Sequence, residues 1–322
     1  MRQKDSDMKA VITTWDKADI EELSVVAMIS NPLFRGYDIE NVKAYLINTN
    51  ERFPSDFVIE ARDENGLLGW LSFEKTTETM GKIGRWQPHI LDMTTREDVF
   101  RRLLNLLTNL AVSRGIIRIE IGYGEVSDSN LDEYGQRAEW LEVEEFLKLE
   151  DNLFLECSLS HCELIGHPLP EGIELQLMVN IESNNLFQCY QESFAVSEHR
   201  QFFDYTELQI REAFDDYFDM SKPFNERASL VLTKDGQVIG FSLVRPRIEE
   251  EHLEVFGLHP DYRVRGLAKA LILKSMSTVS DQGTERMSIG VDAVNVPAVK
   301  LYEKAGFRLV SRMIVHSWKK TD

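Results

Sequence analysis

Residues 256–268 read F-G-L-H-P-D-Y-R-V-R-G-L-A, and this stretch decides how the second half of the chain folds. The apolar run 253–258 predicts a strand, and apolar residues at helical spacing follow the turn that contains Arg263, Arg265 and Gly266. The first N–H groups of a helix have no intrahelical partner and carry the positive end of the macrodipole. A strand, a tight basic turn and a helix therefore predict a pyrophosphate site, with Gly266 allowing close approach.

A second block supports this interpretation. Residues 295–307 read N-V-P-A-V-K-L-Y-E-K-A-G-F and follow a predicted strand over 288–291. Together the two blocks resemble the GNAT-type N-acetyltransferases. The first is similar to the family's R/Q-x-x-G-x-G/A loop, with Ala268 at the last position, and the second matches N-x-x-A-x-x-L-Y-x-x-x-G-F at every specified position.

The resemblance implies that the second half binds acetyl-coenzyme A as co-substrate and needs no metal. In that family the loop holds the diphosphate, main-chain groups of the first of two splayed strands pair with the pantetheine, and the Asn contacts the cofactor arm. The implied cofactor-binding residues are Phe256, Gly257, Leu258, Arg263, Val264, Arg265, Gly266, Leu267, Ala268, Asn295 and Tyr302.

The resemblance also implies that Tyr302 lies beside the sulfur as the general acid. An amine must lose a proton before it attacks, so a base should line the acceptor side. Strand alternation predicts that His252, Glu254, Phe256 and Leu258 share one face, which makes Glu254 the leading candidate base and His252 the second. Asp292 could instead orient a substrate ammonium, and Gly257 suits a bulge or a close backbone approach.

The chain repeats this order of elements at low resolution. Hairpins are predicted over 57–73 around Asn65-Gly66 and over 230–244 around Asp235-Gly236. The predicted fold class is α/β (α+β), with two GNAT folds in tandem, each a mixed, mostly antiparallel twisted sheet flanked by helices. The predicted domains are residues 1–165 and 171–322.

The first copy is predicted to be degenerate. Where the second copy has its basic glycine turn, residues 93–100 read M-T-T-R-E-D-V-F, and Thr95 with Asp98 resembles a capping box. In the tails, Leu141 stands where the second copy has Tyr302, and Glu145 where it has Gly306. The first copy should therefore not bind acetyl-coenzyme A.

The net charge of the chain limits the kinds of partner that it is expected to bind. The 322 residues carry a net charge of −18, divided as −13 through residue 170 and −5 after it. Such a surface repels nucleic acid and anionic membranes, and it attracts cationic substrates such as amines. Acidity that only confers solubility is an equally good explanation. No signal peptide or membrane-spanning run is visible, so a cytoplasmic location is expected, and the oligomeric state is not indicated.

Cys157, Cys162 and Cys189 have no CxxC spacing and are predicted to be reduced. His161 and His167 crowd the first two, but the spacing fits no common zinc module.

The predicted function is an acetyl-coenzyme-A-dependent N-acetyltransferase that acts on a primary amine of a small molecule or peptide by direct transfer. Two alternatives remain open at this point. One is a non-catalytic coenzyme-A-binding regulatory tandem domain, and the other is an acyltransferase that acts on a protein N-terminus.

Overall fold

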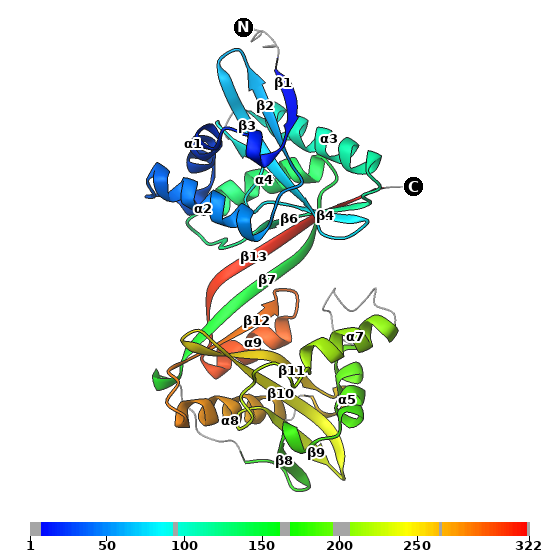
Figure 1. Cartoon of the computed structure of the whole chain (residues 1–322). Coiled ribbons are helices and arrows are strands. Elements are labelled where there is room, and N and C mark those ends of the chain that lie inside the picture. The colour runs from blue at the N-terminus through cyan, green and yellow to red at the C-terminus, as the bar shows by residue number, and fades with distance from the viewer. Residues whose placement is uncertain (1–7, 93–95, 162–167, 196–206, 264–265, 321–322) are drawn as a thin grey trace. The chain divides into compact units, whose positions relative to one another are not determined.

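The computed structural model describes residues 8–92, 96–161, 168–195, 207–263 and 266–320. The chain forms two compact units, one made of Met1–Glu150 with Met313–Asp322 and the other of Asp151–Arg312 (Figure 1).

The first unit is a sheet in the order β1-β2-β3-β4-β6-β13, with the short β5 also paired to β3. Every pair is antiparallel except β4 with β6, which is parallel. The elements are β1 (Lys9–Thr13), α1 (Ile20–Ser30), α2 (Ile39–Arg52), β2 (Phe57–Asp63), β3 (Gly66–Lys75), β4 (Met80–Ile83), β5 (His89–Ile90), α3 (Glu97–Ser113), β6 (Arg118–Tyr123), α4 (Leu131–Val143) and the end of β13 (Arg308–Lys319).

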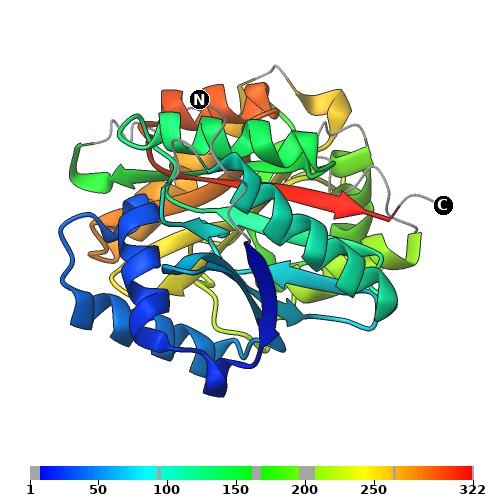
Figure 2. The ribbon, with the colours of Figure 1, turned by 90° about the horizontal axis from the view of Figure 1, so that it is seen from above.

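Helices cover both faces of this sheet. Figure 2 shows α1 and α2 in blue on one side, and α3 and α4 in teal and green on the other. The first face buries a cluster around Leu23, Val42 and Trp70, and the second a larger cluster that includes Phe100 and Trp140. Burying apolar surface on both faces is the main source of stability for such a layered fold.

The second unit repeats the plan in the order β7-β12-β11-β10-β9-β8. Only β11 with β12 is parallel. The elements are β7 (Leu147–Ser158), β8 (Ile173–Leu177), α5 (Ser183–Ala195), α7 (Glu207–Tyr217), β9 (Leu230–Lys234), β10 (Gln237–Arg247), β11 (Glu250–Leu258), α8 (Leu267–Asp281), β12 (Arg286–Asp292) and α9 (Val296–Ala305).

Its two faces are also covered by different helices. Residues of α8 and α9 pack on one face in a cluster that contains Leu253, Met276 and Phe307. Residues of α5 and α7 pack on the other face with Phe241 and Val255. We call these the α8/α9 face and the α5/α7 face.

Each unit is completed by a strand from the other half of the sequence. Residues 152–158 of β7 pair with β12, and residues 314–319 of β13 pair with β6. The predicted domains, residues 1–165 and 171–322, follow chain order, whereas the compact units exchange their last strands. The predicted fold class, two mixed and mostly antiparallel sheets flanked by helices, is confirmed.

The last turns of α4 and α9 have the same geometry, as the alignment of the two tails predicted. Phe146 N–H donates to the Leu141 carbonyl at 2.9 Å, and Phe307 N–H donates to the Tyr302 carbonyl at 3.0 Å. The residue before each of these N–H donors is left-handed, with φ of 63° at Glu145 and 105° at Gly306. Only the second copy has the residue that adopts this conformation without strain.

Glu145→Gly should therefore stabilise the protein. The left-handed conformation costs a non-glycine residue about 1–2 kcal/mol, and glycine's extra entropy offsets about 0.5–1 kcal/mol of that. The expected gain in the free energy of unfolding is about 0.5–1 kcal/mol by these values, measured by urea unfolding. Gly306→Ala is the reciprocal control and should destabilise. A destabilising Glu145→Gly would show that the glutamate side chain contributes more than its backbone strain costs.

Candidate functional site

A gap opens between two parallel strands of the second unit. β11 and β12 pair over only three positions, from Glu251 with Met287 to Leu253 with Ile289. Beyond them β11 continues to Leu258, still paired to β10 on its other edge. The main-chain groups of residues 254–258 on the β12 side thus have no strand partner among the described elements, and they can bond to a ligand.

β11 is bulged at the closed end of the gap. Leu243 pairs with Val255 and Val244 pairs with Leu253, so Glu254 is the extra residue. The bulge lies at Glu254, not at Gly257. A Cβ on Gly257 would come within 2.3 Å of the Phe241 ring, so packing requires that glycine.

Because of the bulge, the prediction that residues 252, 254, 256 and 258 share one strand face is wrong. His252 shares the α5/α7 face with its cross-strand neighbour Arg245, which donates to the main chain of Tyr217 at the end of α7. Glu254 Oε2 lies 4.0 Å from Nη2 of Arg247. Arg247 is on the same face as Arg245, two residues before it on β10. Phe256 instead packs in the α8/α9 core.

Leu258 packs with α8 as well, in a neighbouring apolar cluster. His252 and Glu254 therefore share one face of the sheet, and Phe256 and Leu258 share the other.

The predicted phosphate loop ends in an uncapped helix. Gly266 occupies the N-cap position of α8 with φ of 77°, and no side chain caps this end. Among the described residues, no atom would lie within 4 Å of a Cβ at Gly266, and the left-handed backbone is what favours glycine here. Leu267 and Ala268 begin the helix with their side chains toward the core. Val264 and Arg265 lie outside the described residues.

Arg263 was predicted to add positive charge to the loop, but its guanidinium bonds to main-chain carbonyls instead. Its Nε donates to the Leu258 carbonyl at 3.2 Å and its Nη2 to the Ser193 carbonyl at 2.7 Å. Burial lowers the pKa of this guanidinium. Arg263 thus fastens the loop to the last turn of α5, where a cation also suits the helix dipole.

Tyr302 lies on the α8/α9 face beside the gap. It is 5% exposed, and its ring lies 6.3 Å from that of Phe256 and 6.1 Å from that of Phe307. Burial raises the pKa of the phenol, so it stays protonated at neutral pH. Within the described part of the chain its hydroxyl has no hydrogen-bond partner, which leaves a proton to donate.

Asn295 and Asp292 are partly committed to local structure. Asn295 Oδ1 caps α9 by accepting from Ala298 N–H at 3.3 Å, so only its amide N–H groups remain for a ligand. Asp292 is 3% exposed and accepts from Val294 N–H at 3.0 Å.

In the first unit the corresponding gap is filled by the protein itself. The strand is interrupted between β4 and β5, and Trp86 Nε1 in the interruption donates to the Gly124 carbonyl at 2.7 Å. Tyr123 Oη donates to the Gln87 carbonyl at 3.1 Å, and the fully buried Arg137 donates to the carbonyl that follows it. The carbonyls of Gly124, Gln87 and Pro88 are thus satisfied by the protein's own side chains.

The start of α3 also differs from that of α8. Its N-cap is Arg96, which makes no side-chain cap, and Asp98 accepts from Arg96 Nε at 3.2 Å. The predicted capping box depends on Thr95, which lies outside the described residues. Glu97 and Asp98 still occupy the first turn, whereas α8 has no acidic residue there. A diphosphate at α3 would meet like charge.

The cysteines differ from the prediction in one respect. Cys157 is disulfide-bonded to a partner outside the described residues, so the prediction of three reduced thiols is wrong. Cys189 is a free, buried thiol, and burial raises its pKa to about 12. Cys162 and His167 of the considered zinc set lie outside the described residues, and the rest of the chain holds no group of three potential metal ligands.

Comparisons with known proteins show what this part of the chain resembles. Residues 184–307 match the model of the acetyltransferase (GNAT) family. The mycothiol acetyltransferase of Clavibacter michiganensis subsp. michiganensis is 26% identical over 143 residues. That match covers 44% of each protein, less than half of the relative's length.

Two solved structures resemble the chain over nearly its full length. A GCN5-related N-acetyltransferase from Sphaerobacter thermophilus has a TM-score of 0.60 at 12% identity and covers 96% of this chain and 95% of its own. A tandem GNAT protein from the clavulanic acid biosynthesis pathway has a TM-score of 0.51 at 12% identity, covering 98% and 100%. At such identities the likeness shows the fold, which is two GNAT folds in tandem. None of the helices in the described part of the chain is long and apolar enough to cross a membrane.

Proposed function

We propose that this protein is an N-acetyltransferase that uses acetyl-coenzyme A and transfers the acetyl group directly to a primary amine of a small molecule or peptide. The observation that carries the proposal is the gap between β11 and β12. The start of α8, which has no side-chain cap, lies at one end of this gap. Tyr302 lies on one face of the gap, and His252 and Glu254 lie on the other.

The residues present fit acetyl-coenzyme A. The N–H groups of Leu267 and Ala268 begin a helix without a side-chain cap, and the space around Gly266 is open, which suits a diphosphate. The Leu258 N–H and the main-chain groups of residues 254–257 on the β12 side would bond the pantetheine, and Asn295 has amide N–H groups to donate. When bound, this co-substrate supplies the acetyl group as a thioester.

The side chains divide the chemistry between the two faces. Glu254 or His252 would take the proton of the acceptor amine on the α5/α7 face, and Leu258 N–H would donate to the thioester oxygen as it gains charge. Tyr302 would donate its proton to the departing thiolate on the α8/α9 face. An amine that attacks from one face of the gap expels the thiolate toward the other.

The acceptor is proposed from the relatives and from charge. The matched relative is named for acetyl transfer, and a chain of net charge −18 favours a cationic amine. Gly290 on β12 is exposed, and we propose that the acceptor binds near it.

The test is a screen of amines and amino-terminal peptides for release of free thiol from acetyl-coenzyme A by the full-length protein. At least one amine is expected to give turnover, with the acetylated product found by mass spectrometry. Tight cofactor binding with no turnover across the screen would favour a coenzyme-A sensor, and turnover confined to peptide N-termini would narrow the acceptor class.

A further inference from the structure

Three polar side chains at the closed end of the gap form a hydrogen-bonded chain. His252 Nδ1 lies 2.8 Å from Ser288 Oγ, and Ser288 Oγ donates to Glu250 Oε1 at 2.6 Å. His252 and Ser288 are paired across β11 and β12, and Glu250 lies two residues before His252 on the same face. The chain therefore runs along the α5/α7 face, away from the open end of the gap.

The direction of these bonds follows from the number of protons. A carboxylate only accepts, so the single hydroxyl proton of Ser288 goes to Glu250. His252 must then donate from Nδ1, which leaves the lone pair on Nε2. Nε2 has no hydrogen-bond partner among the described residues. It is thus the ring atom that an acceptor amine can meet.

The environment of His252 disfavours its protonated, charged form. Burial, together with the nearby charge of Arg247, lowers the pKa of His252 to about 3. An imidazolium is therefore strongly disfavoured at neutral pH, while the neutral ring is present throughout. A proton that reaches Nε2 is best passed onward, and the bond to Ser288 provides the path.

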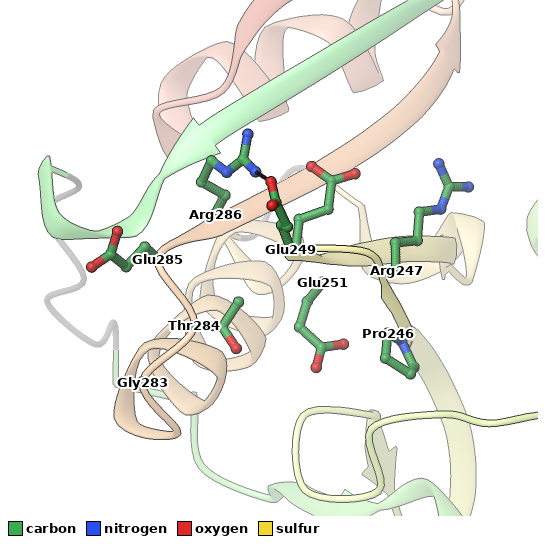
Figure 3. Close-up of a pocket in the computed structure, with 9 residues that line it drawn as sticks. Pro246, Arg247, Glu249, Glu251, Gly283, Thr284, Glu285 and Arg286 are labelled. Atoms are coloured by element: carbon green, nitrogen blue, oxygen red, sulfur yellow. Dashed lines mark hydrogen bonds and ion pairs between the residues drawn. The ribbon is translucent and has the colours of Figure 1, made fainter.

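Glu250 connects this path to water. It lines a polar pocket of about 510 Å³ formed by the β10–β11 turn and the loop before β12. Glu249, which also lines the pocket, is 78% exposed, and its Oε2 lies 3.2 Å from Arg286 Nη2 (Figure 3). The pocket is therefore open to solvent, and a proton on Glu250 can exchange there.

We propose that His252, Ser288 and Glu250 form a proton relay from the acceptor amine to this pocket. The amine proton is transferred to His252 Nε2, the Nδ1 proton to Ser288 Oγ, and the Ser288 hydroxyl proton to Glu250 Oε1, from which water removes it. Each group gains one proton and loses one, so one proton passes from amine to solvent, and exchange with water restores the first tautomer. Ser288 and Glu250 are positioning residues. The relay rests on the proposed acetyltransferase function.

The proton positions can be tested without any substrate. Long-range ¹H–¹⁵N correlation spectra of the full-length protein distinguish the two histidine tautomers, and His252→Gln identifies the signal. The relay predicts that His252 carries its proton on Nδ1 in the wild type and loses this preference in Ser288→Ala. A wild-type His252 protonated on Nε2 would overturn the proposal whether or not the protein acetylates amines.

The kinetic test uses an amine found in the screen. Ser288→Ala and Glu250→Gln should each lower kcat by about 10- to 100-fold, less than loss of a whole general base, while the KM for acetyl-coenzyme A is unchanged. Ser288→Thr keeps the hydroxyl and should recover most of kcat.

Matched controls are Ser275→Ala, which removes another buried hydroxyl of this unit, and Glu249→Gln, which removes a neighbouring carboxylate. Both should retain wild-type kcat. A Ser288→Ala variant with wild-type kcat would contradict the relay while leaving the proposed function in place.

Discussion

Replacing Tyr302 by Phe is expected to lower kcat by about 10²–10⁴-fold, the usual contribution of a general acid. The thiolate gains charge as it leaves, and without the phenol no group of the α8/α9 face that we identify supplies its proton. Binding of acetyl-coenzyme A should change little, because Phe keeps the ring that packs against Phe256 and Phe307. Turnover and cofactor affinity are to be measured separately.

Tyr123→Phe is the matched control for Tyr302→Phe. Tyr123 is also buried, and burial raises its pKa as well, but it belongs to the first unit and donates to the Gln87 carbonyl. Its loss should cost about 1 kcal/mol of stability, as for one hydrogen bond, without affecting kcat. Unchanged turnover in Tyr302→Phe would make Tyr302 a core aromatic residue and favour the sensor alternative.

Gly266→Asp is expected to weaken acetyl-coenzyme A binding by on the order of 100-fold or more. Two like charges 4 Å apart repel by about 4 kcal/mol at an effective dielectric constant of 20, and the aspartate would stand at the helix start that should hold the diphosphate. Asn and Asp tolerate the left-handed conformation that Gly266 adopts better than other residues do, so the fold should survive.

Gly266→Asn separates charge from shape, because Asn has nearly the same size as Asp. It should weaken binding by only a few fold, and both variants should unfold at similar temperatures. Equal cofactor affinity in the two variants would show that the diphosphate does not bind at the start of α8.

The sequence predicted the features that depend on local chemistry. The second hairpin turn is an example, since Asp235 and Gly236 have the two positive φ values, 50° and 79°, of a tight type I′ turn. Gly266 was placed at the right turn for a related reason, because glycine is favoured where φ is positive. The tails aligned correctly because Leu141 and Tyr302 occupy equivalent turns of their helices.

Features that depend on distant pairing were not predicted. His252 and Ser288 are 36 residues apart, and no local pattern reports their register. The sequence did not predict the bulge at Glu254, because the bulge contains no glycine or proline. Nor did the sequence reveal that β7 and β13 are exchanged, since strand alternation predicts which face is buried but not which strand is the neighbour.

The exchange affects how the site can be tested. A fragment of residues 171–322 would lack the part of β7 that pairs with β12 beside the gap. A fragment of residues 1–165 would lack the end of β13 that completes its own sheet. Binding experiments therefore require the full chain with point substitutions.

We propose that the chain has one acetyl-coenzyme A site, in the second unit. Calorimetric titration of the full-length protein with acetyl-coenzyme A measures the number of sites. We expect one molecule bound per chain, because the gap of the first unit is filled around Trp86 and that of the second unit is open. Two molecules bound per chain, or no binding at all, would rule out a single site in the second unit.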